Sequence, residues 1–177
     1  MIKALILDVD GVLSDGGIIL DSEGGEAKRF NVHDGVGIKL AQEAGWKVLF
    51  LTARNSPPAL RRAEEMGVEC ALGVANKEQF LTEWLAGQNL GWGEVAYMGD
   101  DLQDLLPLRR VGYPITVANG VREVREVACH VTERRGGDGA VREAVEWLLD
   151  EFGVREETVK RFTERQGGFS VGHEEQR

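Results

Sequence analysis

The sequence predicts an α/β fold, with helices on both faces of a doubly wound, mostly parallel sheet. The first observation is a set of continuous apolar runs of strand length, which are typical of strands buried on both faces. These runs are KALILDV (3–9), KVLFL (47–51), VAYM (95–98) and ITV (115–117). The second observation is that helical patterns lie between and after the runs, and such alternation favours a parallel sheet.

Helix boundaries follow from capping signals and from the spacing of apolar residues. Ser56 and Pro57 form an N-cap and a first-turn proline, and Asn76 is a second N-cap before Lys77. Glycines mark two expected helix ends, at Gly45 and Gly67. The predicted helices cover residues 34–44, residues 57–67, a segment beginning at Lys77, and residues 140–152.

One stretch interrupts the alternation of strands and helices. Residues 17–30 (GIILDSEGGEAKRF) contain two short strand-like runs around DSEGG, and this pattern predicts a β-hairpin inserted after the first strand. The insert is too small to be a large cap domain. We therefore expect one domain over residues 1–152, with the hairpin at about residues 17–30, and a polar C-terminal tail over residues 153–177.

Composition narrows the class of protein. The chain has 177 residues, of which 42% are hydrophobic and 29% charged, as in soluble globular proteins. Its net charge of −9 argues against a nucleic-acid partner, so an anionic substrate would need locally placed cations. Cys70 and Cys129 form no Cys-x-x-Cys pair, and the first apolar run is too short for a signal peptide or a membrane span. We expect a cytoplasmic protein with no membrane partner.

Chemistry-bearing side chains collect where the predicted strands end. In open α/β sheets, ligands bind beyond the carboxyl ends of the strands. The residues expected there are Asp8 and Asp10 after the first run, Thr52 after the second, Lys77 at a helix start, and Asp100, Asp101 and Asp104 after VAYM. Acidic residues at neighbouring strand ends repel one another unless a cation lies between them, and oxygen ligands of this kind suit Mg²⁺.

A hydroxyl and an ammonium group complete this pattern. Thr52 and Lys77 provide donors that suit the oxygens of a phosphoryl group, so the set predicts phosphoryl transfer. Alternatives remain for three residues. Lys77 could be a solvated lysine at a helix end, and Asp101 and Asp104 could be acids that stabilise a helix N-terminus.

The set resembles the four motifs of the haloacid dehalogenase superfamily of phosphotransferases: LDVDG (7–11), Thr52, Lys77 and GDDLQD (99–104). Within this superfamily the chain is most similar to the 3-deoxy-D-manno-octulosonate 8-phosphate phosphatases, a family of small members without a large cap. The similar stretches are DVDGVLSDG (8–16), GEAKRFNVHDGVGIKL (25–40), LTARNS (51–56), NKEQF (76–80), GDDLQDL (99–105) and GGDGAVRE (136–143). They lie between Met1 and about Phe152.

The resemblance implies roles for four catalytic residues. Asp8 would be the nucleophile that attacks phosphorus and forms an aspartyl-phosphate. Asp10 would protonate the leaving alkoxide and then accept a proton from the hydrolytic water. Thr52 and Lys77 would hold the oxygens of the transferring group.

The resemblance also implies a Mg²⁺ cofactor. Its ligands would be Asp8, the backbone carbonyl of Asp10, and Asp100. Asp104 and Asp101 would lie behind these ligands and support them. The expected reaction is the hydrolysis of a sugar-acid phosphate monoester, with the eight-carbon acid as the first choice.

In the family, the sugar acid is held by a short segment and by cationic side chains. The matching residues here are Asn31, Val32, His33, Asp34, Gly35, Lys39, Arg54 and Arg62, and Asp10 and Lys77 would also touch the substrate. The hairpin resembles the element through which such proteins form homotetramers, each subunit covering a neighbour's site.

Three positions depart from the family pattern. Ala53 stands where the family often has glycine, and His33 and Asp138 stand where it more commonly has arginine. The last two lie near the expected sugar end of the site. Related members act on nine-carbon sugar-acid phosphates, so that substrate remains an alternative.

Two further classes of protein compete with the phosphatase. Receiver domains also combine an α/β sheet, Mg²⁺, an acceptor aspartate, a threonine and a lysine, but their acceptor ends the third strand. Here Thr52 already follows the second apolar run. An assembly subunit that has lost catalysis would keep the fold, but no motif residue is missing from this chain.

Overall fold

The computed structural model describes residues 1–167 and confirms the α/β fold. The main sheet contains β1 (Ala4–Leu7), β4 (Lys47–Leu51), β5 (Glu69–Ala71), β6 (Val95–Met98), β7 (Tyr113–Thr116) and β8 (His130–Val131). All of its pairings are parallel, in the order β5-β4-β1-β6-β7-β8. The edge strands β5 and β8 are too short to produce a clear apolar run, and β5 was not among the predicted strands.

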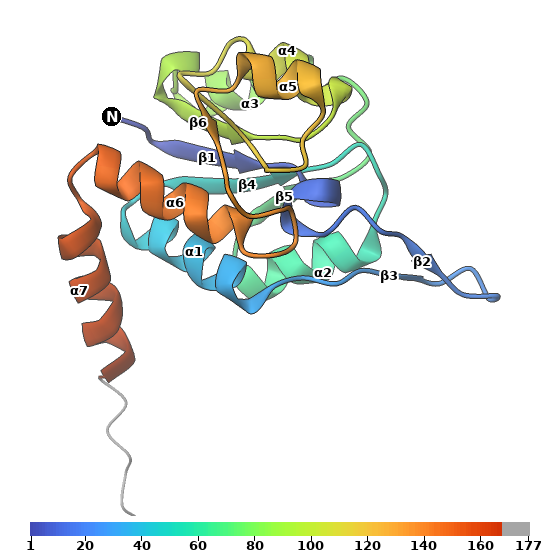
Figure 1. Cartoon of the computed structure of the whole chain (residues 1–177), viewed down its shortest axis with the longest axis horizontal. Coiled ribbons are helices and arrows are strands. Elements are labelled where there is room, and N and C mark those ends of the chain that lie inside the picture. Colours follow the sequence, from blue (N-terminus) through green and yellow to red (C-terminus); the bar gives the residue numbers. More distant parts are fainter. Residues whose placement is uncertain (168–177) are drawn as a thin grey trace, which may run out of the picture.

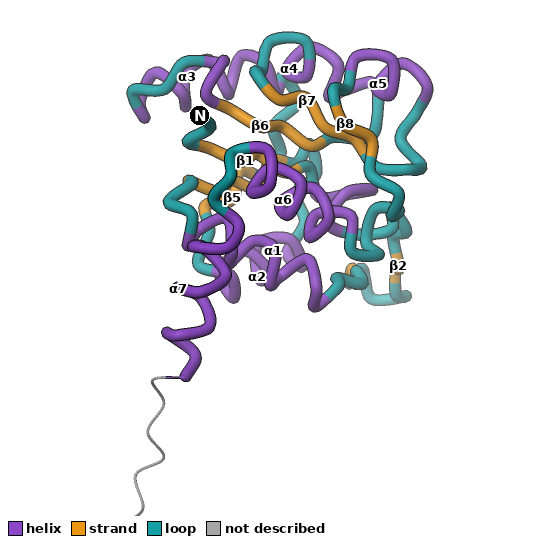
Figure 2. Tube along the Cα trace, turned by 60° about the vertical axis from the view of Figure 1, so that its left-hand side comes forward, coloured by secondary structure: helices purple, strands orange, loops and turns teal. Residues whose placement is uncertain are grey.

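Helices cover both faces of this sheet (Figures 1 and 2). They are α1 (Val32–Glu43), α2 (Pro57–Met66), α3 (Lys77–Gln88), α4 (Leu105–Leu108), α5 (Arg122–Val127), α6 (Ala140–Glu151) and α7 (Arg155–Gly167). Short helical turns add η1 (Val9–Leu13), η2 (Trp92–Glu94) and η3 (Leu102–Asp104). Figure 2 shows α3, α4 and α5 on one side of the strands, and α1, α2 and α6 on the other.

Successive residues of β1 enter two different cores, because side chains alternate along a strand. Leu5 and Leu7 belong to the core beneath α1, α2 and α6, whereas Ala4 and Ile6 belong to the core beneath α3, α4 and α5. All four are fully buried. The same alternation directs Asp8, the next residue, toward the α3 side.

The strand order places a topological switch point between β1 and β6. From β1 the chain winds outward through β4 and β5, and then crosses back to β6, β7 and β8 on the other side. Loops that leave the two strands at such a point diverge and open a crevice for ligands. Asp8 follows β1 and Asp100 follows β6, so both lie at this point.

The predicted hairpin is present. Its strands β2 (Ile19–Leu20) and β3 (Glu26–Ala27) pair antiparallel, and the hairpin projects from the body of the domain in Figure 1. No large cap domain accompanies it within residues 1–167.

Part of the expected polar C-terminal tail is helical. Residues 155–167 form α7, which packs against α1 and α6, and Arg165 pairs with Glu43 at 3.2 Å. The helix was not predicted because its sequence is mostly polar. Its inner face is a narrow stripe in which Thr158 is buried and Phe162 packs on the core. The rest of that expected tail lies outside the described residues. No helix within residues 1–167 is both long and apolar enough to cross a membrane.

Candidate active site

The turn after β1 lies close to the end of β6. The backbone N–H of Asp8 donates to the carbonyl of Met98 at 3.0 Å, which continues the pairing of β1 with β6. The chain then turns sharply at Gly11, whose φ is +95°. A Cβ atom on Gly11 would lie 2.0 Å from Oδ2 of Asp100, so only glycine allows this approach of the two acidic segments.

Lys77 connects two buried carboxylates. Its ammonium donates to Oδ1 of Asp8 at 2.6 Å and to Oδ1 of Asp104 at 2.7 Å. All three residues are at most 2% exposed. Burial alone would lower the pKa of Lys77, but the charges of Asp8 and Asp104 outweigh it and raise that pKa. Lys77 is therefore a charged part of the site, and the solvated-lysine alternative is wrong.

The carboxylate of Asp104 is fully engaged by the protein itself. Besides Lys77, Oδ1 accepts from the hydroxyl of Tyr97 at 2.7 Å, and Oδ2 accepts from the backbone N–H groups of Asp100 at 3.0 Å and Asp101 at 3.2 Å. Burial raises the pKa of Tyr97 well above its ordinary value, so its hydroxyl remains a donor. Asp104 thus has no free oxygen to offer a metal and instead fixes the loop that carries Asp100.

Asp101 has a different position from the one expected in a metal site. It is exposed, and its Oδ1 accepts from the backbone N–H of Leu102 at 2.7 Å at the start of η3. Its side chain therefore serves the helix terminus, which is the second of the two roles that the sequence left open.

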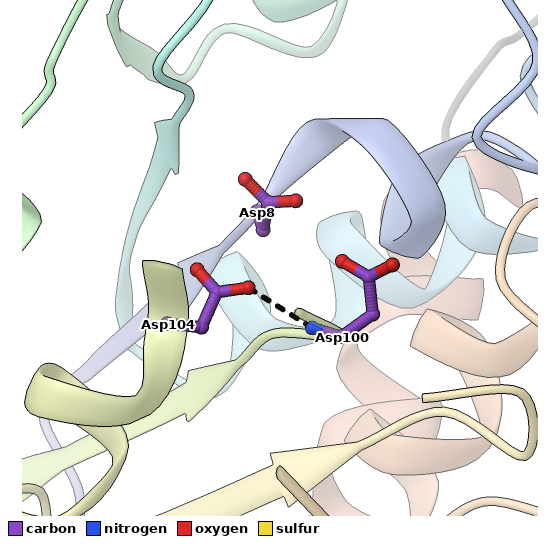
Figure 3. A group of neighbouring side chains, drawn as sticks. All are labelled: Asp8, Asp100 and Asp104. Carbon is purple, nitrogen blue, oxygen red and sulfur yellow. Dashed lines mark hydrogen bonds between the residues drawn. The ribbon is translucent and has the colours of Figure 1, made fainter. Parts of the chain in front are cut away.

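Asp8, Asp100 and Asp104 form an acidic cluster in which one carboxylate oxygen of each residue lies within 4.8 Å of the other two (Figure 3). Among the described residues, Oδ2 of Asp8 and Oδ1 of Asp100 are buried without any hydrogen-bond partner. If all three carboxylates are ionised, the single ammonium of Lys77 leaves two negative charges uncompensated. Unpartnered, buried carboxylate oxygens are the donors that a hard divalent cation requires, so the residues fit Mg²⁺.

The pKa values of Asp8 and Asp100 are both raised, first by burial and then by neighbouring negative charge. Burial raises the pKa of Asp8 well above its ordinary value, although Lys77 opposes the rise. Burial and the neighbouring charges of Asp104 and Asp101 raise the pKa of Asp100 to about 7. A bound cation would reverse both effects, because it stabilises the ionised carboxylates.

Asp10 lies outside that cluster and faces the hairpin. Its Oδ1 accepts from the ammonium of Lys28, and its Oδ2 lies 3.5 Å from the hydroxyl of Thr52. The hydroxyl of Thr52 also accepts from the backbone N–H of Arg54 at 3.1 Å. Asp10 and Thr52 are therefore neighbours, as expected from the ends of adjacent strands. Because its carboxylate lies outside the cluster, Asp10 could bind the metal only through its backbone carbonyl.

Some of the expected substrate residues gather in a shallow pocket beside α1 and α2. Val32, Gly35, Lys39 and Arg62 line this cavity of about 160 Å³. The backbone carbonyl of Asn31 accepts from Arg62 at 3.3 Å. Arg62 is also paired with Glu65 at 2.8 Å, and its side chain is only 13% exposed.

Three other expected substrate residues are placed differently. Asp34 is only 2% exposed, and its carboxylate accepts from the backbone N–H groups of Gly139 at 3.3 Å and Arg142 at 3.0 Å, so it stabilises the first turn of α6. Arg54 pairs with Glu26 of the hairpin at 2.8 Å. His33 is exposed, and its backbone N–H donates to the side chain of Asn31 at 2.8 Å.

Sequence reasoning missed three residues of this network. Tyr97 is a hydroxyl inside an apolar strand, and a buried tyrosine usually requires a hydrogen-bond partner, which was a usable signal. Glu26 and Lys28 are two residues apart in a predicted strand and therefore share one side of it. Their partners, Arg54 and Asp10, depend on how the hairpin packs against the domain.

Comparisons with known proteins agree with this geometry. Residues 73–143 match the haloacid dehalogenase-like hydrolase family. The chain is 36% identical over 153 residues to the 3-deoxy-D-manno-octulosonate 8-phosphate phosphatase of Haemophilus influenzae, covering 86% of this chain and 85% of that protein. It is 40% identical over 149 residues to the enzyme of the same name from Salmonella typhi, covering 84% and 79%.

A solved structure is similarly close. The crystal structure of 3-deoxy-D-manno-octulosonate 8-phosphate phosphatase from Moraxella catarrhalis, in complex with magnesium ion, phosphate ion and KDO, superposes with a TM-score of 0.87. The sequence identity is 38%, and the match covers 91% of this chain and 93% of that one. The similarity therefore extends over most of both chains.

Proposed function

The chain belongs to the haloacid dehalogenase-like hydrolases, in the phosphoric monoester hydrolase family of 3-deoxy-D-manno-octulosonate 8-phosphate phosphatases, and from this premise we propose its reaction. It hydrolyses the phosphate ester of an eight-carbon sugar acid to the free acid and inorganic phosphate, with Mg²⁺ as cofactor and an aspartyl-phosphate intermediate. Membership in a hydrolase family argues against the receiver-domain alternative. The presence of every motif residue argues against an assembly subunit without catalysis, and failure to hydrolyse any ester of the substrate panel below would support that alternative.

The observation that carries the proposal is the acidic cluster at the switch point. Asp8 and Asp100 each hold one buried oxygen without a partner, and Lys77 is bonded to the same Asp8 carboxylate. A site of this kind can take both a divalent cation and an anionic phosphoryl group. When bound, Mg²⁺ would be held by Asp8 and Asp100 and would reduce the charge repulsion between the phosphoryl group and the carboxylates.

The chain's own residues then carry out the reaction in two steps. Asp8 forms the new bond to phosphorus as the bond to the leaving alkoxide breaks, and Asp10 gives that alkoxide a proton. Water then attacks the phosphorus of the aspartyl-phosphate, the bond from phosphorus to Asp8 breaks, and Asp10 takes the proton from this water. Asp8 is thereby restored as a carboxylate and Asp10 as the protonated acid. Lys77 and Thr52 hold the phosphoryl oxygens throughout.

A substrate panel tests the proposed function. Phosphate release should be measured for the 8-phosphate of the eight-carbon acid, a nine-carbon sugar-acid 9-phosphate and glucose 6-phosphate, each with Mg²⁺ and with EDTA. We expect the eight-carbon ester to have the highest kcat/KM and EDTA to abolish its turnover. A higher kcat/KM for the nine-carbon ester would reassign the substrate and leave the reaction class intact.

Two variants test the nucleophile in the same assay. Asp8→Asn should eliminate phosphate release, because an amide cannot form the aspartyl-phosphate. Asp150→Asn removes a carboxylate from the exposed side of α6 and serves as the matched control. Activity that persists undiminished in Asp8→Asn would exclude the mechanism.

Magnesium binding can be measured without turnover. In isothermal titration calorimetry, Asp100→Asn should weaken Mg²⁺ binding by about tenfold or more, because the variant removes a charged oxygen ligand. Asp150→Asn should bind Mg²⁺ as the wild type does. Equal affinities for the wild type and Asp100→Asn would place the ion elsewhere.

We also propose that the hairpin forms the interface of a homotetramer. Ile19 and Leu20 on β2 are 63% and 69% exposed, which is unusual for large apolar side chains on neighbouring residues. Sedimentation velocity of the wild type and of an Ile19→Ser, Leu20→Ser double variant would test this assembly, and an unchanged sedimentation coefficient would exclude it. The cytoplasmic location expected from the sequence stays a prediction.

A further inference from the structure

Lys28, just after the second strand of the hairpin, has its side chain buried against the domain. The side chain of Lys28 is 0% exposed, and its ammonium contacts Oδ1 of Asp10 and lies 3.1 Å from Oε1 of Glu26. Lysine is seldom enclosed in this way unless it is paired with acidic groups. The position of Lys28 is therefore a specific feature of the site and differs from that of an ordinary surface lysine.

The alternation of side chains that begins in β3 continues just past its end and explains how Lys28 reaches this place. Residues two apart on an extended chain share a side, so Glu26 and Lys28 face the domain, while Ala27 and Arg29 are exposed. Consistent with this, Arg29 is 65% exposed and makes only a 3.5 Å contact with Asp15.

Glu26 fixes the inner side of the hairpin to the loop after β4. Its Oε2 accepts from Arg54 at 2.8 Å, and its Oε1 accepts from the hydroxyl of Ser56 at 2.7 Å. The same loop contains Thr52, which faces Asp10. One continuous polar network thus joins the hairpin to two of the residues assigned to the reaction.

We propose that Lys28 is a positioning residue for phosphoryl transfer, which orients the carboxylate of Asp10 from the hairpin and is itself held in place by Glu26. The inference rests on the proposed function. Because Lys28 engages Oδ1, the proton that Asp10 transfers is carried on Oδ2, the oxygen on the Thr52 side. In the first step the Oδ2–H bond breaks, the proton goes to the leaving oxygen, and the bond from that oxygen to phosphorus breaks as Asp8 bonds to phosphorus.

Leaving groups of similar shape separate this role from a purely structural one. Phenyl phosphate and 4-nitrophenyl phosphate are close in size, but 4-nitrophenolate leaves without a proton, whereas phenolate benefits from one. The parameter kcat/KM reports the steps up to phosphoryl transfer to Asp8. A residue that acts through Asp10 therefore affects the phenyl ester more than the nitrophenyl ester.

The experiment compares Lys28→Met, Lys28→Arg and Glu26→Gln with the wild type in the presence of Mg²⁺. We expect Lys28→Met to lower kcat/KM about tenfold for phenyl phosphate and by less than about threefold for 4-nitrophenyl phosphate. Lys28→Arg should restore most of the difference, since it keeps a cation on Asp10. Glu26→Gln should show the same selectivity for the phenyl ester in weaker form.

Arg29→Met is the matched control, because it removes a cation from the neighbouring, exposed position just after β3. It should leave both kcat/KM values at the wild-type level. If Lys28→Met does not fold, as judged by its circular dichroism spectrum, Glu26→Gln carries the test. Equal losses on the two esters would overturn the inference alone, whereas no phosphate release from any ester by the wild type would overturn the proposed function with it.

Discussion

The ammonium nitrogen of Lys77 lies 2.6 Å from Oδ1 of Asp8, although the two residues are 69 positions apart in the chain. Lys77 begins α3, and Asp8 follows the central strand β1. The alternation of side chains along β1 directs Asp8 to the face that α3 covers. The contact therefore follows from the sheet topology, and it determines the charge of the site.

Lys77→Met should be damaging to both stability and activity. The variant leaves Asp8 and Asp104 buried without their shared cation, and removal of one partner from a buried ion pair costs about 3 kcal/mol or more. Phosphate release should fall by about a hundredfold or more, since a donor to the transferring group is lost. Urea unfolding in EDTA and the phosphate assay measure the two effects. Lys160→Met, on the exposed side of α7, is the control, and wild-type values for Lys77→Met would contradict this account.

Gly11→Ala tests the close approach of the two acidic segments. The methyl group would collide with Oδ2 of Asp100 at 2.0 Å, and a φ of +95° is unfavourable for alanine. We expect the free energy of unfolding to fall by about 2 kcal/mol and Mg²⁺ binding to weaken. Gly87→Ala, in the last turn of α3 where an added Cβ meets no atom within 4 Å, should instead stabilise by up to about 0.5–1 kcal/mol. Unchanged Mg²⁺ binding in Gly11→Ala would show that Asp100 tolerates displacement.

Asp34→Ala separates a structural role from substrate binding. Loss of the two backbone contacts at the start of α6 should lower the free energy of unfolding by about 1–2 kcal/mol. Asp138→Ala changes an exposed acid in the turn just before α6 and should have little effect on stability. Denaturant unfolding and KM should be measured together. A tenfold rise in KM without any loss of stability would return Asp34 to the substrate-binding set.

Glu26 provides a pH dependence with a defined sign. Hydrogen bonds from Ser56 and Arg54 lower the pKa of Glu26 from 4.5 to about 2. Its stabilising contribution is therefore complete above about pH 4.5 and is lost as the pH falls toward 2. Glu26→Gln should lower the free energy of unfolding by about 1 kcal/mol at pH 7, and the difference from wild type should shrink in acid.

Unfolding curves at pH 7, 4 and 2.5 would measure this difference. Glu23→Gln, an exposed change in the same hairpin, is the control. A difference between Glu26→Gln and the wild type that stays constant from pH 7 to pH 2.5 would contradict the assigned pKa.

Local patterns were sufficient for the four central strands of the sheet, for four of the helices and for the acidic strand ends. A strand buried on both faces must be apolar throughout, and helix caps depend on residues within one turn, so KVLFL and Asn76 could be interpreted directly. Patterns failed where an element was short or mostly polar, as in β5 and α7. Three residues or a narrow apolar stripe leave too little periodicity to detect.

By itself, the sequence determined which residues stand at the ends of the strands, and therefore that Asp8, Thr52, Lys77 and Asp100 would meet at one edge of a parallel sheet. Only the tertiary structure decided how these groups are paired: that Asp104 is saturated by its neighbours, that Asp34 serves α6, and that Lys28 reaches Asp10. The physical reason is that the direction of a carboxylate depends on donors from distant segments. Their sequence separations of 27, 108 and 18 residues leave no periodic trace in the chain.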